Sequence, residues 1–150
     1  MSKLKEGQKA PELGINNQDG KKVVLEQLAG RKTVIYFYPK DDTPGCTKES
    51  CNLRDNYKEL LKAGYEVIGI SPDSEKRHQN FIAKYNLPFD LLADIDKEVC
   101  ERYGVWVEKN MYGRKYMGVA RTTFVLDENG IIEEVISKVN TKDHTSQILR

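Results

Sequence analysis

Two of the chain's three cysteines, Cys46 and Cys51, stand five residues apart in the segment "DDTPGCTKESC" (residues 41–51). An apolar run precedes this segment and a helical pattern follows it, so we expect Cys46 at the first turn of a helix. The unpaired N–H groups and the positive dipole end of a helix N-terminus stabilise an anion, and a cysteine placed there can have its pKa lowered from about 8.5 to between about 3.5 and 7.5. Because the thiolate is the nucleophilic form, Cys46 is a candidate nucleophile.

Helix geometry separates the two thiols. At about 100° per residue, three apolar side chains fall within about 40° of the direction of Cys46, namely Leu53, Tyr57 and Leu60. Cys51 lies about 140° away, toward the wetter face. The two α-carbons would be about 9 Å apart, whereas a disulfide tolerates no more than about 7 Å. If these cysteines bond to each other, the first turns of the helix must unwind, which predicts a switch that is helical when reduced and locally unfolded when oxidised.

The residues around Cys46 suit this chemistry. Thr43 offers a hydroxyl that can both accept and donate a hydrogen bond, and Pro39 ends the preceding strand where it can restrict water. Pro44 and Gly45 shape a tight turn into the helix. Taken singly, a cysteine is often a small buried hydrophobic residue, and Thr43 is typical of a helix N-cap. The joint arrangement at a strand-to-helix junction, with a second thiol in reach, favours a catalytic site.

The elements that must place Cys46 follow from the hydrophobic pattern. Residues 33–38 form a β-branched and aromatic run that Pro39 closes, which predicts a fully buried strand ending just before the thiol segment. Apolar residues then recur at helical spacing over residues 53–61, up to Gly64. This spacing indicates a helix that begins near Cys46 and stops at Gly64.

Strand and helix signals continue to alternate toward the C-terminus. The run "YEVIGIS" predicts another buried strand, and "SPDSEKRHQNFIAKYN" predicts a helix that Ser71 or Asp73 can cap. Residues 87–93 predict a short strand, and "DIDKEVCERYG" predicts a short helix that stops at Gly104.

A hairpin signal and a short polar tail end the chain. "TTFVLDENGIIEEVIS" contains two strand-like runs around Asn129 and Gly130, a dipeptide typical of tight β-turns. A βαβα stretch followed by a hairpin predicts an α/β fold, with a central mixed β-sheet flanked by helices. That is the pattern of a thioredoxin-like fold, although the order of elements alone also allows other α/β layouts.

Composition narrows the class of protein. At 150 residues the chain has the size of one domain, and we expect residues 1–150 to form a single one. Its 24 Lys and Arg against 23 Asp and Glu leave a net charge of +1, which gives no electrostatic reason to expect nucleic acid or a membrane surface as a partner. No apolar run approaches the length of a membrane span or a signal peptide, and an odd number of cysteines favours a reducing compartment. We therefore expect a cytoplasmic protein.

The thiol segment resembles that of a known family. "PKDDTPGCTKESC" is similar to the peroxiredoxin active-site motif P-x3-T-x2-C, and its continuation T-x-E-x-C is similar to the bacterioferritin comigratory protein or peroxiredoxin Q subfamily. Further landmarks occur in the family's order, namely "APELG", "GISPDS", "KYNLPFDLLAD", "YGVW" with "MYG", and "ARTTFVLDENG". The resemblance spans nearly the whole chain and implies a thioredoxin-like fold.

This resemblance implies a thiol peroxidase for hydrogen peroxide and organic hydroperoxides. By position, Cys46 would be the peroxidatic cysteine, Thr43 its hydrogen-bond partner and Pro39 the shield over the site. Arg121, from "ARTTF", would be the cation that completes the pocket, and Cys51 would be the resolving cysteine. The Cys46 sulfenic acid would condense with Cys51 to a disulfide, which thioredoxin or a similar dithiol would reduce. No flavin, haem or metal is implied, and we expect a monomer or a weak dimer.

The remaining residues with reactive or large side chains are expected to lie outside the active site. Cys100 is expected to be structural, with resolution of Cys46 as its minor alternative. His78 and His144 are expected to be solvated, and the three cysteines and two histidines form no zinc-site spacing. Core filling is favoured over a loop beside the pocket for four further side chains, namely Trp106, Met111, Tyr112 and Tyr116.

Two other functions remain open. A thioredoxin-type disulfide oxidoreductase would use C-x-x-C, whereas the spacing here is C-x4-C. A redox sensor or binding protein, switched by oxidation of Cys46, would not need Thr43 and Arg121 to stabilise charge.

Overall fold

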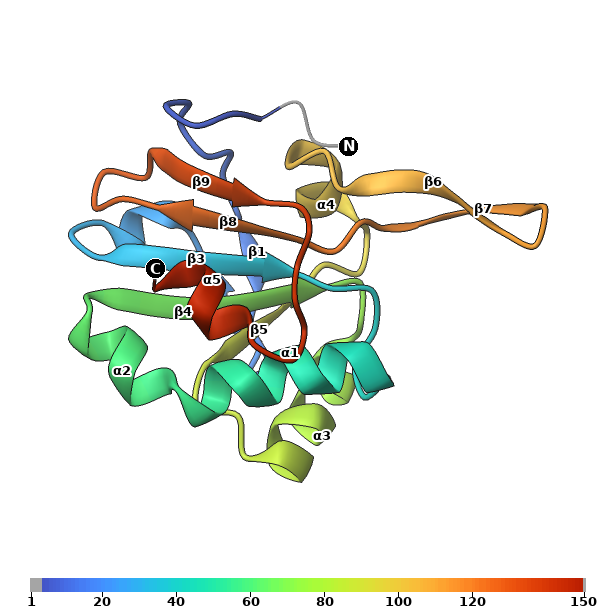
Figure 1. The fold of residues 1–150 in the computed structure, drawn as a ribbon, viewed down its shortest axis with the longest axis horizontal. Coiled ribbons are helices and arrows are strands. Elements are labelled where there is room, and N and C mark those ends of the chain that lie inside the picture. The colour runs from blue at the N-terminus through green and yellow to red at the C-terminus, as the bar shows by residue number, and fades with distance from the viewer. Residues whose placement is uncertain (1–3, 150) are drawn as a thin grey trace.

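A computed structural model describes residues 4–149. Its main sheet has five strands in the order β5-β4-β3-β8-β9 (Figure 1). These strands are β3 (Lys32–Phe37), β4 (Tyr65–Ser71), β5 (Asp90–Ala93), β8 (Thr122–Leu126) and β9 (Ile132–Ile136). The first three run parallel to one another, and β8 and β9 are antiparallel additions. The predicted mixed sheet and the hairpin at Asn129 and Gly130 are therefore confirmed.

The central strand β3 divides the core into two. Its side chains alternate, as a strand buried on both faces requires. Val34 and Tyr36 pack in one apolar cluster with Cys46, whereas Ile35 and Phe37 pack in a second cluster on the other face. Cys46 thus belongs to the core of one face of the sheet only.

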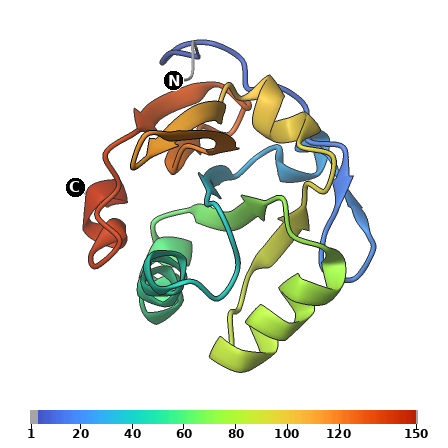
Figure 2. The ribbon, with the colours of Figure 1, turned by 90° about the vertical axis from the view of Figure 1, so that its right-hand side faces the viewer.

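Helices cover both faces of the sheet (Figure 2). The cluster that holds Cys46 is covered by α1 (Pro44–Asp55), α2 (Tyr57–Lys62), α3 (Glu75–Tyr85) and α5 (His144–Ile148). The other face is covered by α4 (Glu98–Arg102) and by an N-terminal segment with β1 (Ile15–Asn16), β2 (Lys22–Val23) and the 3-10 helix η1 (Leu25–Leu28). None of the helices within residues 4–149 has the length and apolar character that a bilayer crossing needs.

A second hairpin, which the sequence analysis missed, projects from the body of the protein (Figure 1). It consists of β6 (Trp106–Met111) and β7 (Arg114–Val119), paired antiparallel. The two-residue turn at Tyr112 and Gly113 has positive φ at both positions, which matches the right-handed twist of a hairpin. Core filling was the wrong expectation for three side chains, because the projecting hairpin exposes Met111, Tyr112 and Tyr116. Trp106, at the base of the hairpin, is half-buried against the core.

Three boundaries differ from the sequence analysis. The single helix expected from near Cys46 to Gly64 is divided at Asn56 into α1 and α2. The strand expected over residues 87–93 begins only at Asp90. Neither Ser71 nor Asp73 caps α3, because Ser74 is the N-cap and its hydroxyl accepts a hydrogen bond from the Arg77 N–H at 3.2 Å. Ser71 instead donates its hydroxyl hydrogen to Asp73 at 2.6 Å.

Candidate active site

Cys46 lies in the first turn of α1, where the sequence places it. Pro44 is the first helical residue, and Thr43 before it has an extended backbone with φ −100° and ψ 155°. The first helical hydrogen bond runs from the Thr47 N–H to the Thr43 carbonyl at 2.8 Å. The N–H groups of Gly45 and Cys46 precede this bond, so they have no partner within the helix. A thiolate at Cys46 therefore meets the positive end of the helix dipole.

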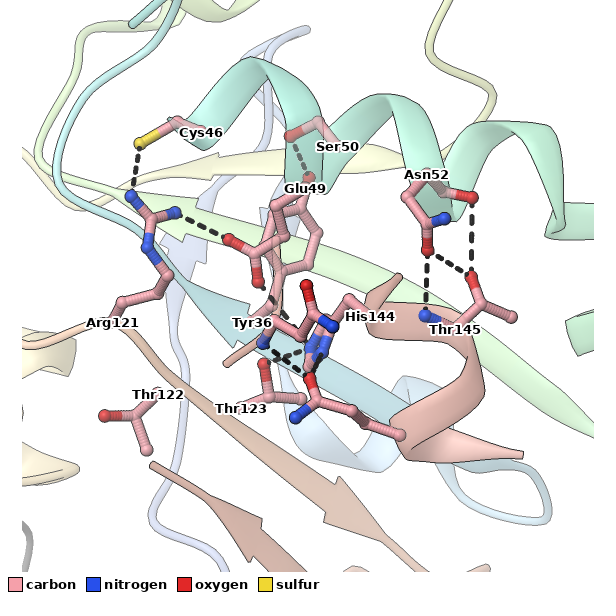
Figure 3. A network of polar contacts seen from close by, with 12 residues as sticks. Tyr36, Cys46, Glu49, Ser50, Asn52, Arg121, Thr122, Thr123, His144 and Thr145 are labelled. Atoms are coloured by element: carbon pink, nitrogen blue, oxygen red, sulfur yellow. Dashed lines mark hydrogen bonds and ion pairs between the residues drawn. The ribbon is translucent and has the colours of Figure 1, made fainter. Parts of the chain in front are cut away.

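Arg121, one residue before β8, joins Cys46 to Glu49 (Figure 3). Its Nη2 donates to the Cys46 Sγ at 3.3 Å, and its Nη1 donates to the Glu49 Oε1 at 2.7 Å. Burial lowers the pKa of Arg121, but the charges of Cys46 and Glu49 outweigh burial and leave this pKa above its ordinary value. The guanidinium is thus a fixed cation between a thiol and a carboxylate.

The glycine before Cys46 makes room for this cation. A Cβ on Gly45 would lie 3.2 Å from the Arg121 Nη2, which is closer than ordinary van der Waals contact. The absent side chain lets the guanidinium approach the first turn of α1, where the thiol is.

Thr43 directly precedes this turn, and Pro39 follows the end of β3 by two residues. Both are half-buried, and the Thr43 hydroxyl donates to the Lys40 carbonyl at 2.9 Å. This bond tightens the loop before α1 and leaves the lone pairs of the hydroxyl oxygen free to accept from a ligand. No side-chain capping bond is formed by Thr43, although it occupies the N-cap position.

Cys51 lies in the same continuous helix as Cys46 but faces elsewhere. Cys46 is 1% exposed and belongs to the core, whereas Cys51 is half-buried, and all three cysteines of the chain are free thiols. Burial raises the pKa of Cys51 above its ordinary value, so this side chain is a thiol rather than a thiolate at neutral pH. Since both residues lie within one unbroken α1, the separation of about 9 Å derived from helix geometry applies, and a bond between them requires unwinding.

Glu49 is the site residue that the sequence analysis missed. It is fully buried, and this burial raises the pKa of its carboxyl to about 7 against the opposing charge of Arg121. Two signals in the sequence could have located it: Glu49 is the E of the T-x-E-x-C motif, and a residue three positions after Cys46 shares its face of the helix. A carboxylate is the natural partner of a cation held in the core.

His144 is fully buried, contrary to its expected solvation. Its Nε2 lies 2.8 Å from the Thr123 Oγ1 and 3.6 Å from the Glu49 Oε2. The polar tail folds into α5, which packs beside α1 and carries this imidazole into the interior. Solvation was wrong because two of the partners of His144, Thr123 and Glu49, are far away in sequence.

His78 is also fully buried, so the second expectation of solvation was wrong as well. Its Nδ1 lies 2.7 Å from the Asp41 Oδ2, and its Nε2 lies 2.9 Å from the Leu92 carbonyl. Asp41, His78 and Asp73 bring three potential metal-ligand atoms within 4.8 Å of one another. Each residue is engaged in hydrogen bonds to its protein neighbours, and this fits an anchor for the loop before α1.

Cys100 lies on the far side of the sheet from Cys46. It is fully buried in the cluster that contains Ile35 and Phe37, and its backbone N–H donates to Asp94 at 2.8 Å. Burial raises the pKa of its thiol far above the ordinary value. An inert, buried thiol with the sheet between it and Cys46 fits a structural role.

The fold and the site define a class. A thiol at the N-terminus of a helix, packed on a thioredoxin-like sheet and held by a guanidinium, is a site for thiol redox chemistry. Comparison with known proteins gives the family: the AhpC/TSA family model matches residues 6–135. The chain belongs to this family, and its similarities place it among the Bcp or peroxiredoxin Q proteins.

These similarities extend over nearly the whole chain. A putative peroxiredoxin bcp of Coxiella burnetii is 53% identical over 143 residues, which is 95% of each chain, and peroxiredoxin Bcp of Escherichia coli K12 is 44% identical over 149 residues, with coverage of 99% and 96%. Among solved structures, the bacterioferritin comigratory protein of Xanthomonas campestris has a TM-score of 0.86 at 36% identity, with coverage of 99% and 95%, and its study concerned alkyl peroxide reduction. As a peroxiredoxin, the protein is a thiol peroxidase.

Proposed function

We propose that Cys46 reduces hydrogen peroxide and organic hydroperoxides, that Cys51 of the same chain resolves the product, and that a thioredoxin-type dithiol completes the cycle. The Cys46 thiolate attacks one peroxide oxygen, the O–O bond breaks, and the other oxygen leaves with a proton as water or an alcohol. Cys46 is thereby oxidised to a sulfenic acid and the peroxide is reduced. The Cys51 thiol then displaces the sulfenic oxygen as water and forms a disulfide, which the external dithiol reduces by exchange.

The contact that carries this proposal is the bond from the Arg121 Nη2 to the Cys46 Sγ at 3.3 Å. Negative charge lies on the sulfur before attack and moves to the departing oxygen during it. The guanidinium and the free N–H groups of Gly45 and Cys46 lie where both charges occur, and the Thr43 hydroxyl can hold the peroxide. Donors fixed in advance stabilise the transition state without reorganisation.

A relative supports organic hydroperoxides as substrates. The bacterioferritin comigratory protein of Xanthomonas campestris was studied for alkyl peroxide reduction, and this chain is 36% identical to it. Pro39 is only half-buried, and its ring offers an alkyl group an apolar surface on which to lie.

Two observations support Cys51 as the resolving cysteine: the position of Cys100 excludes it, and Cys51 can reach Cys46. Cys100 is on the other face of the sheet, whereas Cys51 is in the same helix and gains access as that helix unwinds. Three free thiols suit a reducing compartment, and we propose the cytoplasm as the location and a monomer or weak dimer as the working form.

Two cysteine variants test this function. Cys46→Ser should abolish peroxide turnover, and Cys51→Ser should reduce one equivalent of peroxide but lose recycling by thioredoxin. Cys100→Ser is the matched control and should retain both. Undiminished recycling by Cys51→Ser would overturn the assignment of Cys51, and normal turnover by Cys46→Ser would overturn that of Cys46.

A redox sensor is the alternative that the same thiol allows. A sensor needs the oxidation of Cys46 and the change in α1, but not repeated turnover. Steady consumption of peroxide with thioredoxin and its reductase favours the peroxidase, whereas oxidation that stops after one equivalent favours the sensor.

A further inference from the structure

The β6–β7 hairpin carries most of the large apolar side chains that the protein exposes. Within residues 4–149, five such side chains are exposed, and four of them belong to this hairpin, namely Met111, Tyr112, Tyr116 and Met117. Exposed apolar side chains that are gathered on one element, rather than scattered singly, mark a surface that contacts a partner. Tyrosine and methionine are also among the residue types that are enriched at protein interfaces.

The base of this hairpin lies at the rim of the active site. The Ala120 N–H donates to the Val105 carbonyl at 2.7 Å and closes the base. The next residue is Arg121, whose Nη2 donates to the Cys46 Sγ at 3.3 Å. Figure 1 shows the hairpin projecting from the end of the sheet at which α1 begins. A protein that contacts the start of α1 from solvent is therefore placed to contact the hairpin as well.

The strand register separates two faces of the hairpin. Directly paired residues share a face, and successive residues of a strand point to opposite faces. Lys109 pairs with Tyr116, and Met111 pairs with Arg114. These four side chains therefore lie on one face, which we call the basic face.

The two faces differ in charge. On the other face the Lys115 Nζ lies 3.7 Å from the Glu108 Oε1, so a cation there is paired with an acid. The basic face carries Lys109 and Arg114 but no acidic residue. Neither of these two cations forms an ion pair within residues 4–149. The basic face therefore attracts a surface that is acidic.

Lys109 connects the basic face to the active site. A Cβ on Gly118 would lie 3.2 Å from the Lys109 Cδ and 3.4 Å from its Cε, so the absent side chain lets the half-buried lysine lean toward the base of the hairpin. Burial lowers the pKa of Lys109, the charge of Arg121 lowers it further, and the charge of Cys46 raises it. These opposing effects fit a cation near both groups, and they make the basic face continuous with the thiol site.

We propose that the basic face of the β6–β7 hairpin is the docking surface for the dithiol protein that reduces the oxidised enzyme. The partner that fits this face has an apolar surface with acidic residues next to its reactive cysteines. A bilayer fits less well, because lipid recognition by basic clusters uses about four to eight cations, whereas this face has two. The inference rests on the proposed function, since it assumes that a dithiol protein completes the cycle.

Docking places the two reacting groups together. One thiolate of the partner attacks a sulfur of the disulfide between Cys46 and Cys51, that S–S bond breaks, and a mixed disulfide forms. The second thiol of the partner then displaces the cysteine of this chain. The partner leaves oxidised to a disulfide, and its two electrons and two protons return Cys46 and Cys51 to thiols.

Tyr116→Asp tests the docking surface, with Met117→Asp as its matched control. The two residues are adjacent and are 42% and 50% exposed, but Met117 pairs with Glu108 on the other face, so the same new acid enters opposite faces. The readout is the kcat/KM for thioredoxin, measured with its reductase and saturating hydrogen peroxide. We expect it to fall by about tenfold or more in Tyr116→Asp and to stay within about threefold in Met117→Asp.

Three further measurements separate docking from chemistry. Dithiothreitol is too small to need a docking surface, so it should reduce both oxidised variants at the wild-type rate. The rate constant for oxidation by hydrogen peroxide should stay within about twofold of the wild type in both variants. In the wild type, raising the salt concentration from about 0.02 M to about 0.5 M should lower the kcat/KM for thioredoxin but not the rate with dithiothreitol, because salt screens the attraction between charged surfaces.

The outcomes distinguish this inference from the proposed function. An equal kcat/KM in the two variants, with the wild type recycled by thioredoxin, would overturn the docking surface and leave the proposed function intact. A wild-type protein that dithiothreitol recycles and thioredoxin does not would contradict the proposed reductant and, with it, this docking surface. Wild-type binding to phosphatidylglycerol vesicles that Tyr116→Asp abolishes, with no change in kcat/KM, would assign the face to a lipid surface instead.

Discussion

At the scale of single residues, the chemistry depends on how one cation is shared. Arg121 contacts the Cys46 sulfur through one nitrogen and Glu49 through another, and the carboxylate keeps the guanidinium in place for the thiol. The sequence predicts Cys46 from its position at a strand-to-helix junction. It indicates Arg121 only through the family resemblance, because an isolated arginine is usually a solvated surface residue. Glu49 is the E of the T-x-E-x-C motif and stands three residues after Cys46, but the sequence analysis gave it no role.

Arg121→Lys tests the shared cation. A lysine keeps the charge, but its three N–H donors share one nitrogen, so it lacks the planar fork by which two guanidinium nitrogens reach the sulfur and the carboxylate separately. We expect the second-order rate constant for oxidation by hydrogen peroxide to fall by about 10²-fold, as for the loss of one transition-state donor. Stopped-flow fluorescence measures it, and Arg114→Lys on the exposed hairpin is the control. A rate equal to that of the wild type would exclude bridging by Arg121.

Gly45→Ala tests the close approach of the cation. The new Cβ would lie 3.2 Å from the Arg121 Nη2, so the guanidinium must move by a few tenths of an ångström. We expect oxidation of Cys46 to slow by about 3- to 10-fold, while the urea midpoint does not fall, because alanine favours a helix over glycine by up to about 1 kcal/mol. Lys48→Ala, exposed on the same helix, should change neither. Loss of stability without loss of rate would be the opposite of this expectation.

At the scale of elements, α1 must be both a scaffold and a switch. Its start near Cys46 could be predicted from Pro44, Gly45 and the preceding strand, and the structure has the helix begin at Pro44. Its docking against α5 could not, because the tail "DHTSQILR" has neither length nor periodicity to indicate a helix. The β6–β7 hairpin was missed for a different reason: its turn, Tyr112 and Gly113, lacks the common Asn-Gly signal.

The pH dependence of unwinding follows from Glu49. Burial raises the pKa of its carboxyl from 4.5 to about 7 in the helical state, and exposure on unwinding restores the ordinary value. The helical state therefore binds more protons between these two values, so this contribution to helix stability is fully present below about 4.5 and is lost as the pH rises through 7. Disulfide formation should accelerate over this range.

Glu49→Gln removes this dependence. The thiolate fraction of Cys51 also rises with pH, but it does so equally in both proteins, so the ratio of the wild-type rate to the variant rate isolates Glu49. We expect this ratio to increase by about tenfold or more from pH 5 to pH 7.5, since each pKa unit is worth a factor of ten. Quenched-flow alkylation followed by mass spectrometry gives the rates. A ratio that stays constant with pH would show that Glu49 is not released on unwinding.

At the scale of the whole molecule, buried polar networks join segments that are distant in sequence. His78 links Asp41, in the loop before α1, to the Leu92 carbonyl of β5, and the Tyr38 hydroxyl donates to the same Asp41 at 2.6 Å. The strand and helix pattern could be predicted locally, whereas the burial of His78 could not. Its partners lie 37 and 14 residues away, and only the tertiary fold brings them together.

His78→Ala tests this network. It leaves the Asp41 carboxyl and a carbonyl without their partner in the core, and breaking a buried pair in this way costs about 3–5 kcal/mol. We expect a decrease of that order in the free energy of unfolding, measured by urea denaturation of the reduced protein. Lys76→Ala, an exposed neighbour on α3, should stay within about 0.5 kcal/mol of the wild type. An equally small change for His78→Ala would mean that the network does not hold the loop.

The most direct test of the whole account is one turnover. The fully reduced protein is mixed with one equivalent of hydrogen peroxide, oxidation is followed through the fluorescence of Trp106, and the product is mapped by mass spectrometry. We predict rapid oxidation and a disulfide between Cys46 and Cys51, with Cys100 still free. Reaction at the rate of an ordinary thiol, or a disulfide that contains Cys100, would contradict it.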